Sequence, residues 1–288
     1  MAKEKKDKKV GNGTLVLKRL IKNQNAVIGL VILVIIILMA VFADVIAPYG
    51  YAEVNLPDRL QTPSAAHLFG TDEMGRDLFS RIIYGARDTL KLSLGTVIFG
   101  TGVGIILGSI AGYFGGWVDN LIMRILDIIS AIPGILMAIC ISAVLGSGLI
   151  PTIFALGVGG IPGAARIIRA QMISVREQEF VEAATSINAG KIRIIAKHVF
   201  PNSMSPLIVS ASMSLANAII AASSLSFIGL GVQPPNPEWG ALLSAGRSQI
   251  RDYPHLVMIP GIVIMLTVLA FNMLGDGLRD ALDPKLKK

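Results

Sequence analysis

Few residues of this chain have the types and the spacing that catalysis or metal binding needs. The three histidines, His67, His198 and His255, lie in different connecting segments, and the single cysteine, Cys140, lies in an apolar run. We therefore expect neither a metal site nor an internal disulfide. Ala189-Gly190-Lys191 is followed by isoleucine and has no upstream glycine, so it is not the phosphate-binding loop G-x-x-x-x-G-K-[ST]. We expect that the chain is not an enzyme and holds no cofactor.

Ionisable side chains within apolar stretches are costly in a membrane and point to function by default. Arg124 and Asp127 are three residues apart in the apolar stretch 118–146, a spacing that lets two side chains pair on a helix. The pair is either structural or functional, and the residues alone do not decide. Asn217 and Asn272 are polar side chains in later stretches, and for them we favour hydrogen bonds to a neighbouring helix over a place in a pathway.

Composition places the chain in a membrane. Of its 288 residues 53% are hydrophobic, and the mean hydropathy is +0.66, both above the values of ordinary soluble domains. The net charge is +7, but the basic residues gather at the ends of apolar stretches rather than along one face. Such residues are typical of the cytoplasmic side of a membrane protein, so we expect no binding to nucleic acid.

Six apolar stretches are each long enough to span a bilayer as a helix. They are 26–47, 89–113, 118–146 (interrupted by Pro133-Gly134), 149–171 (interrupted by Pro162-Gly163), 204–230 and 256–276. The first is longer than the 7–15 apolar residues of a signal peptide, so we expect an uncleaved anchor. The sequence predicts an all-α integral membrane protein with six transmembrane helices.

Charge bias predicts the orientation of these helices. The basic tail 1–25 stays in the cytoplasm, and its first lysines are expected to contact anionic lipid. Six spans then leave both termini inside, where the tail 278–288 carries three more lysines. Segment 48–87, which is rich in carboxylates, and segment 231–255 are expected outside the cell.

The second stretch carries glycines four residues apart, at Gly100, Gly104, Gly108 and Gly112. Small residues at this spacing let two helix backbones approach closely in lipid. Helix packing is the favoured interpretation, and a sliding contact between moving helices remains open.

The polar insert 174–202 is too polar to span a bilayer and longer than a turn requires. Ser174 and Glu177 match a capping box, which predicts a helix with Phe180, Ala184 and Ile187 on one face. Asn188-Ala189-Gly190 breaks it, a second short helix follows from 191 to 199, and Pro201 is expected to end that helix. A helix-turn-helix at the membrane surface is typical of a docking element for another protein.

Glu182-Ala183-Ala184, followed by Phe200-Pro201-Asn202, resembles the coupling loop of permease subunits of ABC importers. That family expects glycine at position 188, where this chain has Asn188, with Gly190 two residues later. Three longer stretches resemble the C-type permease subunit of dipeptide and oligopeptide importers. They are 69–87 (Phe-Gly-Thr-Asp-Glu-Met-Gly-Arg-Asp and beyond), 226–240 (Ser-Phe-Ile-Gly-Leu-Gly and beyond) and 272–284 (Asn-Met-Leu-Gly-Asp-Gly and beyond), so the resemblance covers almost the whole chain.

The resemblance implies a type I importer fold, with an anchor helix at 26–47 and a five-helix permease domain at 88–277. It implies a homologous B-type permease, two ATPase subunits that carry ATP and Mg²⁺, and an extracytoplasmic binding protein, all at a prokaryotic cell membrane. ATP binding and hydrolysis in those partners would drive alternating access. The residues assigned to coupling are Glu182, Ala183, Ala184, Asn188, Gly190 and Pro201.

Three functions remain open on the sequence. The first is import of di- or oligopeptides, and the second is import of nickel or a nickel chelate by a permease of the same family. A stand-alone channel or secondary transporter is the third, although no inverted repeat is evident. Selectivity of the binding protein separates the first two, and uptake without ATP would favour the third.

Overall fold

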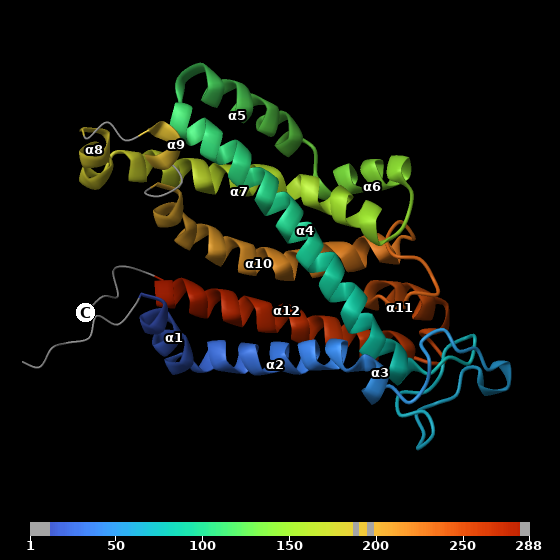
Figure 1. Cartoon of the computed structure of the whole chain (residues 1–288). Coiled ribbons are helices and arrows are strands. Elements are labelled where there is room, and N and C mark those ends of the chain that lie inside the picture. Colours follow the sequence, from blue (N-terminus) through green and yellow to red (C-terminus); the bar gives the residue numbers. More distant parts are fainter. Residues whose placement is uncertain (1–11, 187–189, 195–198, 283–288) are drawn as a thin grey trace, which may run out of the picture.

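The computed structural model describes residues 12–186, 190–194 and 199–282. The secondary structure of these residues is helical, apart from one isolated antiparallel bridge between Thr71 and Asp77. Figure 1 shows long helices side by side, with the connecting segments gathered at the two ends of the bundle. The prediction of an all-α protein is thus confirmed for the described residues.

Five of the described helices are long and apolar enough to span a membrane. They are α2 (Gln24–Val41), α4 (Leu78–Phe114), α7 (Leu149–Arg176), α10 (Phe200–Phe227) and α12 (His255–Leu282). A bent pair, α5 (Gly116–Ala131) and α6 (Gly134–Leu145), gives the sixth span if it is counted as one. The prediction of six spans is confirmed, with the third broken in two.

The break in the third span follows from Pro133. The two helices meet at 89°, and Ile132 between them is extended, with φ −90° and ψ 127°. The ring of a proline excludes the residue before it from the helical region, so α5 has to end there. Pro162, by contrast, lies inside α7, which continues through it.

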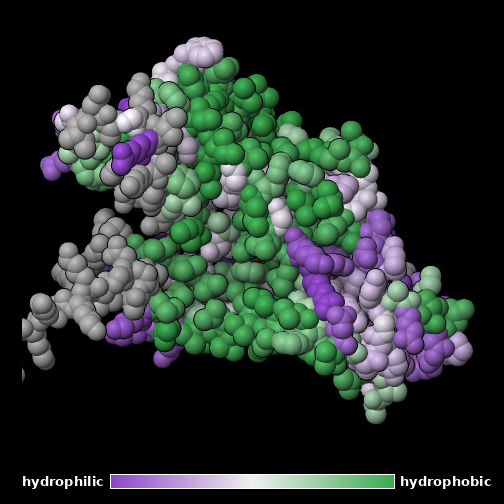
Figure 2. Space-filling view, in the orientation of Figure 1, coloured by the Kyte–Doolittle hydropathy of each residue, from purple (hydrophilic) through white to green (hydrophobic). Residues whose placement is uncertain are grey.

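Shorter helices complete the fold. They are α1 (Asn12–Lys22), α3 (Ala43–Ile46), η1 (Leu56–Asp58), α8 (Glu179–Ser186), α9 (Lys191–Ile194), α11 (Trp239–Gly246) and η3 (Arg247–Gln249). In Figure 1 α1, α8 and α9 lie at one end of the bundle, and α11 and the segment between α3 and α4 lie at the other. Figure 2 shows apolar surface over the middle of the bundle and polar surface gathered on that second end.

α4 begins at Leu78, inside the segment 48–87 that the sequence analysis places outside the membrane. Asp77 fixes this start, because its carboxylate accepts a hydrogen bond of 2.7 Å from the amide of Ser80 and lies 3.0 Å from Nδ1 of His67. The first turns of α4 are polar, with Arg81, Arg87 and Asp88. That polarity hides them from a search for apolar stretches.

α1 is a helix that the sequence analysis did not predict within the tail 1–25. Leu17 and Ile21 are exposed, and so are Lys18 and Lys22. Apolar and basic side chains of α1 therefore both lie at the surface. Asn23 ends it and caps α2, accepting a hydrogen bond of 3.2 Å from the amide of Ala26. α1 has only about three turns and several basic residues, so it did not meet the length and hydropathy that indicate a membrane-spanning helix.

The glycine stripe of α4 faces α7. Added Cβ atoms at all four positions would come within 3 Å of α7: Gly100, Gly104, Gly108 and Gly112. At Gly104, for example, a Cβ would lie 2.6 Å from Cβ of Ala164 and 2.9 Å from the carbonyl oxygen of Ile161. The two backbones therefore lie in close contact from Gly100 to Gly112, and α4 and α7 form the most extensive contact between two described helices.

Glu238 and Trp239 join α11 to the bundle, and both are fully buried. The indole Nε1 of Trp239 donates 3.0 Å to the carbonyl oxygen of Ile82 on α4. The Glu238 carboxylate caps α11, accepting from the amides of Gly240 at 2.9 Å and Ala241 at 3.0 Å. Burial raises the pKa of this carboxyl, and the two amide hydrogen bonds oppose that shift.

Candidate functional site

The predicted coupling residues lie at the end of the bundle, in and around α8 and α9 (Figure 1). Glu182 and Ala183 are exposed on α8, while Ala184 is 8% exposed and turns toward the protein. Gly190 is exposed just before α9, and Pro201 is in the first turn of α10. Asn188 lies outside the described residues. Among the residues of this set whose exposure the structure describes, Glu182, Ala183 and Gly190 are exposed.

Two predictions about this insert are wrong. Ser174 and Glu177 do not start a helix, because α7 continues to Arg176 and Glu177 is its C-cap; α8 starts at Glu179. Pro201 begins α10 rather than ending a helix. Proline suits the first helical turn, where its missing N–H has no partner to lose. The capping-box pattern failed because tertiary packing keeps α7 helical beyond the apolar stretch.

The buried face of α8 also differs from the prediction. Val181 is 4% exposed, and with Ala184 it forms the face that packs inward, whereas Phe180 is 39% exposed. Ile187, the third residue of the predicted face, lies outside the described residues. The predicted and observed faces share Ala184, and Val181 rather than Phe180 packs inward beside it.

A single hydrophobic cluster joins the insert to two membrane helices. It brings together residues of α7 (Ile168, Met172 and Val175), α8 (Val181 and Ala184), α9 (Ile194) and the start of α10 (Val199 and Leu207). Ser203 of α10 lies in the same region, and its hydroxyl is 3.7 Å from the sulfur of Met172. Close-packed side chains therefore connect α8 and α9 to both α7 and α10.

A hollow of about 510 Å³ lies beside α8. Its lining comes from the end of α4, the end of α7, α8 and α9: Tyr113, Phe114, Arg176, Glu177, Val181, Glu182 and Ile194. Arg176 crosses between two of these elements, since its Nη1 donates 2.9 Å to the carbonyl oxygen of Tyr113. The hollow beside the exposed face of α8 is therefore lined by aromatic and aliphatic side chains together with the charged residues Arg176, Glu177 and Glu182.

The predicted pair of Arg124 and Asp127 is not formed. Asp127 instead accepts 2.9 Å from Nη2 of Arg166 on α7, and Arg124 is exposed with no ion pair to any residue within the described ranges. Asp119 of α5 pairs with both Nε and Nη2 of Arg169, each at 2.5 Å. These pairs join α5 to α7. Local spacing could not reveal them, because the partners are 39 and 50 residues apart.

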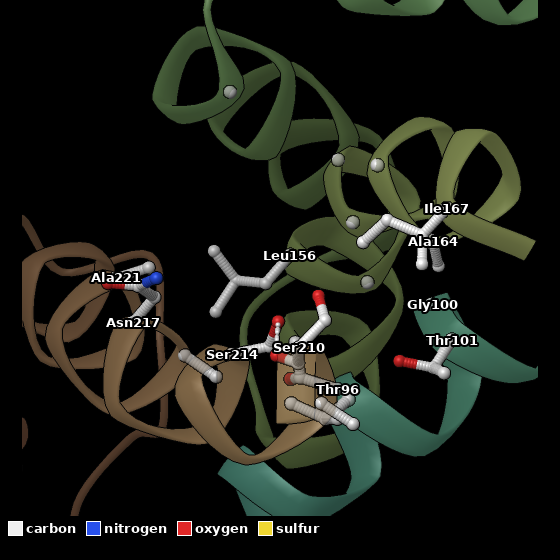
Figure 3. Close-up of a pocket in the computed structure, with 18 of the residues that line it drawn as sticks. Thr96, Gly100, Thr101, Leu156, Ala164, Ile167, Ser210, Ser214, Asn217 and Ala221 are labelled. Atoms are coloured by element: carbon white, nitrogen blue, oxygen red, sulfur yellow. Dashed lines mark hydrogen bonds between the residues drawn. The ribbon is translucent and has the colours of Figure 1, made fainter. Parts of the chain in front are cut away.

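A cavity of about 440 Å³ lies between α4, α6, α7 and α10 (Figure 3). Small residues line most of it, and the labelled polar side chains come from two helices, Thr96 and Thr101 on α4 and Ser210, Ser214 and Asn217 on α10. Asn217 makes no hydrogen bond with a residue of the described chain, so the favoured bond to a neighbouring helix is not formed. Among the same residues no group of three His, Cys, Asp or Glu is arranged to hold a metal.

Solved structures resemble this architecture. An inward-facing form of the MetNI methionine ABC transporter superimposes with a TM-score of 0.58 at 18% identity, over 70% of this chain and 96% of that one. A second crystal form gives 0.54 at 19% identity, over 68% and 93%. At such identities the likeness concerns the fold, which is that of a type I ABC importer permease. The chain thus has the multi-pass helical fold of this class of structures.

Sequence comparison gives the family. Residues 104–288 match the binding-protein-dependent transport system inner membrane component, and residues 13–63 match the N-terminal TM domain of oligopeptide transport permease C. The dipeptide transport system permease protein DppC of Alkalihalophilus pseudofirmus is 49% identical over 94% of this chain and 89% of its own. A glutathione transport system permease protein, GsiD of Pectobacterium atrosepticum, is 44% identical over 94% and 90%. The chain belongs to the family of binding-protein-dependent ABC importer permeases.

Proposed function

We propose that this chain is one permease subunit of an ATP-driven importer and forms half of the translocation pathway for di- or oligopeptides. An extracytoplasmic binding protein delivers the peptide, a homologous B-type permease forms the other half, and two ATPase subunits bind ATP and Mg²⁺. The chain itself catalyses no reaction and holds no cofactor. Its relatives that transport dipeptide and glutathione support a peptide as the cargo.

The observation that carries this proposal is the seat of α8 and α9. They project from the end of the bundle with Glu182 and Ala183 exposed, while Val181 and Ala184 anchor them to α7 and α10 through one cluster. A short helix fixed between two membrane helices transmits rigid-body motion from a docked partner. We assign the exposed face, with Gly190 and the unplaced Asn188, to ATPase contact, and Ala184 and Pro201 to the seat.

Orientation follows the same assignment. We infer that the end with α1, α8 and α9 is cytoplasmic, so that both termini lie inside a prokaryotic cell membrane. Exposed basic residues at that end, Lys18, Lys22, Arg176 and Arg193, support this direction. The segment between α3 and α4 then faces the outside, where a binding protein can reach it.

The test of docking is purification of the tagged chain in mild detergent, with its partners identified by mass spectrometry. We expect a second six-span permease and nucleotide-binding subunits to co-purify. Ala183→Trp should lose the ATPase subunits and still insert, because position 183 is exposed and its own bundle tolerates the larger side chain. Ala52→Trp, at an exposed alanine at the opposite end, is the matched control and should retain them.

Retention of the ATPase subunits by Ala183→Trp would contradict docking on this face of α8. Recovery of the wild-type chain alone, still folded and transporting, would contradict the importer itself.

A further inference from the structure

The cavity between α4, α6, α7 and α10 has room for larger side chains than those that line it. Gly134 on α6 and Gly159 and Gly163 on α7 line it, and a Cβ added at any of the three would meet no heavy atom within 4 Å. None of the three has a positive φ, so backbone conformation does not demand glycine either. Glycine inside a helix lowers stability relative to alanine. The free space itself is therefore the feature that these positions preserve.

Hydrogen-bonding groups face this space without partners. Thr96 is 7% exposed, and its hydroxyl has no hydrogen-bond partner in the structure although it lines the cavity. Thr101, Ser210 and Asn217 also line it, and their side chains make no hydrogen bond with a described residue. Figure 3 shows Thr96 and Thr101 on α4 and Ser210 and Asn217 on α10, on different walls of the same space. An unpartnered buried hydroxyl is destabilising unless something else pairs with it.

The walls of this cavity are uncharged where the structure describes them. The described residues that line it include no Asp, Glu, Lys, Arg or His, although charged pairs join α5 to α7 elsewhere in the bundle. Hydroxyl and amide groups both donate and accept hydrogen bonds, so they pair with the N–H and C=O groups of any main chain. A charged wall in a low-dielectric cavity would attract one class of side chain and repel another.

We propose that Thr96, Thr101, Ser210 and Asn217 form an uncharged site that binds the main chain of a peptide in transit. This half of the pathway then reads the amide groups common to all peptides and does not select by side-chain charge. The cavity volume of about 440 Å³ lies within the roughly 300–1,000 Å³ of small-molecule sites. This inference rests on the proposed function as a peptide permease and assigns the residues that contact the cargo.

The decisive variant introduces one charge without changing shape. Asn217→Asp replaces the amide by a carboxylate of nearly equal size, in the complete importer reconstituted in proteoliposomes with its binding protein and internal ATP. The measurement is initial uptake of labelled dialanine, alanylglutamate and alanyllysine. Dividing each variant rate by the wild-type rate for the same peptide removes the selectivity of the binding protein.

We expect the alanylglutamate-to-dialanine ratio to fall about tenfold relative to wild type, because two carboxylates repel strongly at short range in this medium. The alanyllysine ratio should not fall. Asn272→Asp, the same change in α12 outside the cavity lining, is the control and should leave both ratios unchanged. Equal ratios in Asn217→Asp and wild type overturn the inference and leave the importer intact.

A second variant keeps the test decisive if Asn217→Asp fails to assemble. Gly163→Leu fills the cavity without meeting the chain's own atoms at Cβ, so it should insert normally and co-purify with the partners. Uptake of all three peptides should fall at least about tenfold, since a blocked site no longer admits a main chain. Normal uptake overturns the inference, as does loss of the second permease, which would make this space a subunit contact. Failure of wild type to take up dialanine with ATP would instead overturn the proposed function.

Discussion

Two groups of glycines in this protein serve opposite ends. On α4, Gly104 and its neighbours in the stripe lie against α7 so closely that a single added carbon would overlap another backbone. On α6 and α7, Gly134, Gly159 and Gly163 border empty space. The first group removes side chains so that helices can touch, and the second removes them so that a cavity stays open. The same residue type therefore marks both a close backbone contact between two helices and the open wall of a cavity.

The contrast between the groups is broken most strongly at the tight contact. Gly104→Leu should destabilise the protein by about 3 kcal/mol or prevent folding, because overpacking forces α4 away from Ala164. Gly159→Leu is the matched change at the open group and should cost less than about 0.5 kcal/mol. Thermal unfolding in detergent, followed by size-exclusion chromatography, measures both. Equal losses would contradict the distinction between the groups.

The ion pairs that join α5 to the far side of α7 give the next effect. Arg169→Leu leaves Asp119, whose side chain is 13% exposed, without its partner. We expect a loss of about 2 kcal/mol, below the 3–5 kcal/mol of a fully buried pair because Arg169 is 33% exposed. Arg166→Leu, in the more exposed pair, should cost about 0.5 kcal/mol. A double variant of Arg169 and Asp119 that is no more stable than Arg169→Leu would contradict direct pairing.

The cap of α11, to which the amide of Gly240 contributes, gives the third effect. Glu238→Ala removes the side chain that accepts from Gly240 and Ala241, and should cost about 1 kcal/mol of stability. Burial raises the pKa of Glu238, which disfavours its charged form. Each carboxylate oxygen accepts from a separate backbone amide, and glutamine keeps only one of these two acceptors, so Glu238→Gln should also cost about 1 kcal/mol. A Glu238→Gln variant as stable as wild type would contradict a cap made by both oxygens.

The smallest stability effect belongs to the open group, where stability and transport should separate. Thr96→Val removes a hydroxyl that has no partner among the described residues, so we expect stability to be unchanged or higher by up to about 1 kcal/mol. The KM of peptide uptake should rise, because one contact to the cargo is lost. A destabilised variant with unchanged KM would show that the hydroxyl serves the fold.

The sequence predicts the membrane helices well because their signal is local. An apolar stretch long enough to span a bilayer is visible without any knowledge of its neighbours. Five of the six stretches appear as single helices, and the third appears as the bent pair α5 and α6. The starts of α4 and α8 were not predicted correctly. The first turns of α4 are polar, and at α8 the packing of α7 overrides the capping-box pattern.

The sites are predictable only in part. The regular spacing of Gly104 and its neighbours identifies a close helix contact. The open glycines have no regular spacing, and the cavity that they border exists only once four helices have packed together. The partners of Asp119 and Asp127 lie on another helix. A spacing of three residues along the sequence therefore predicted Arg124 as the partner of Asp127, which was wrong. For α8, the pattern placed Phe180 on the buried face, where the structure has its neighbour Val181.

The most direct test of the account is uptake of labelled dialanine by the reconstituted importer. Four conditions are compared, with and without internal ATP and with and without the binding protein. An ATP-driven importer should accumulate the peptide only when both are present. Uptake that persists without ATP would contradict it and would make the chain a stand-alone channel or carrier.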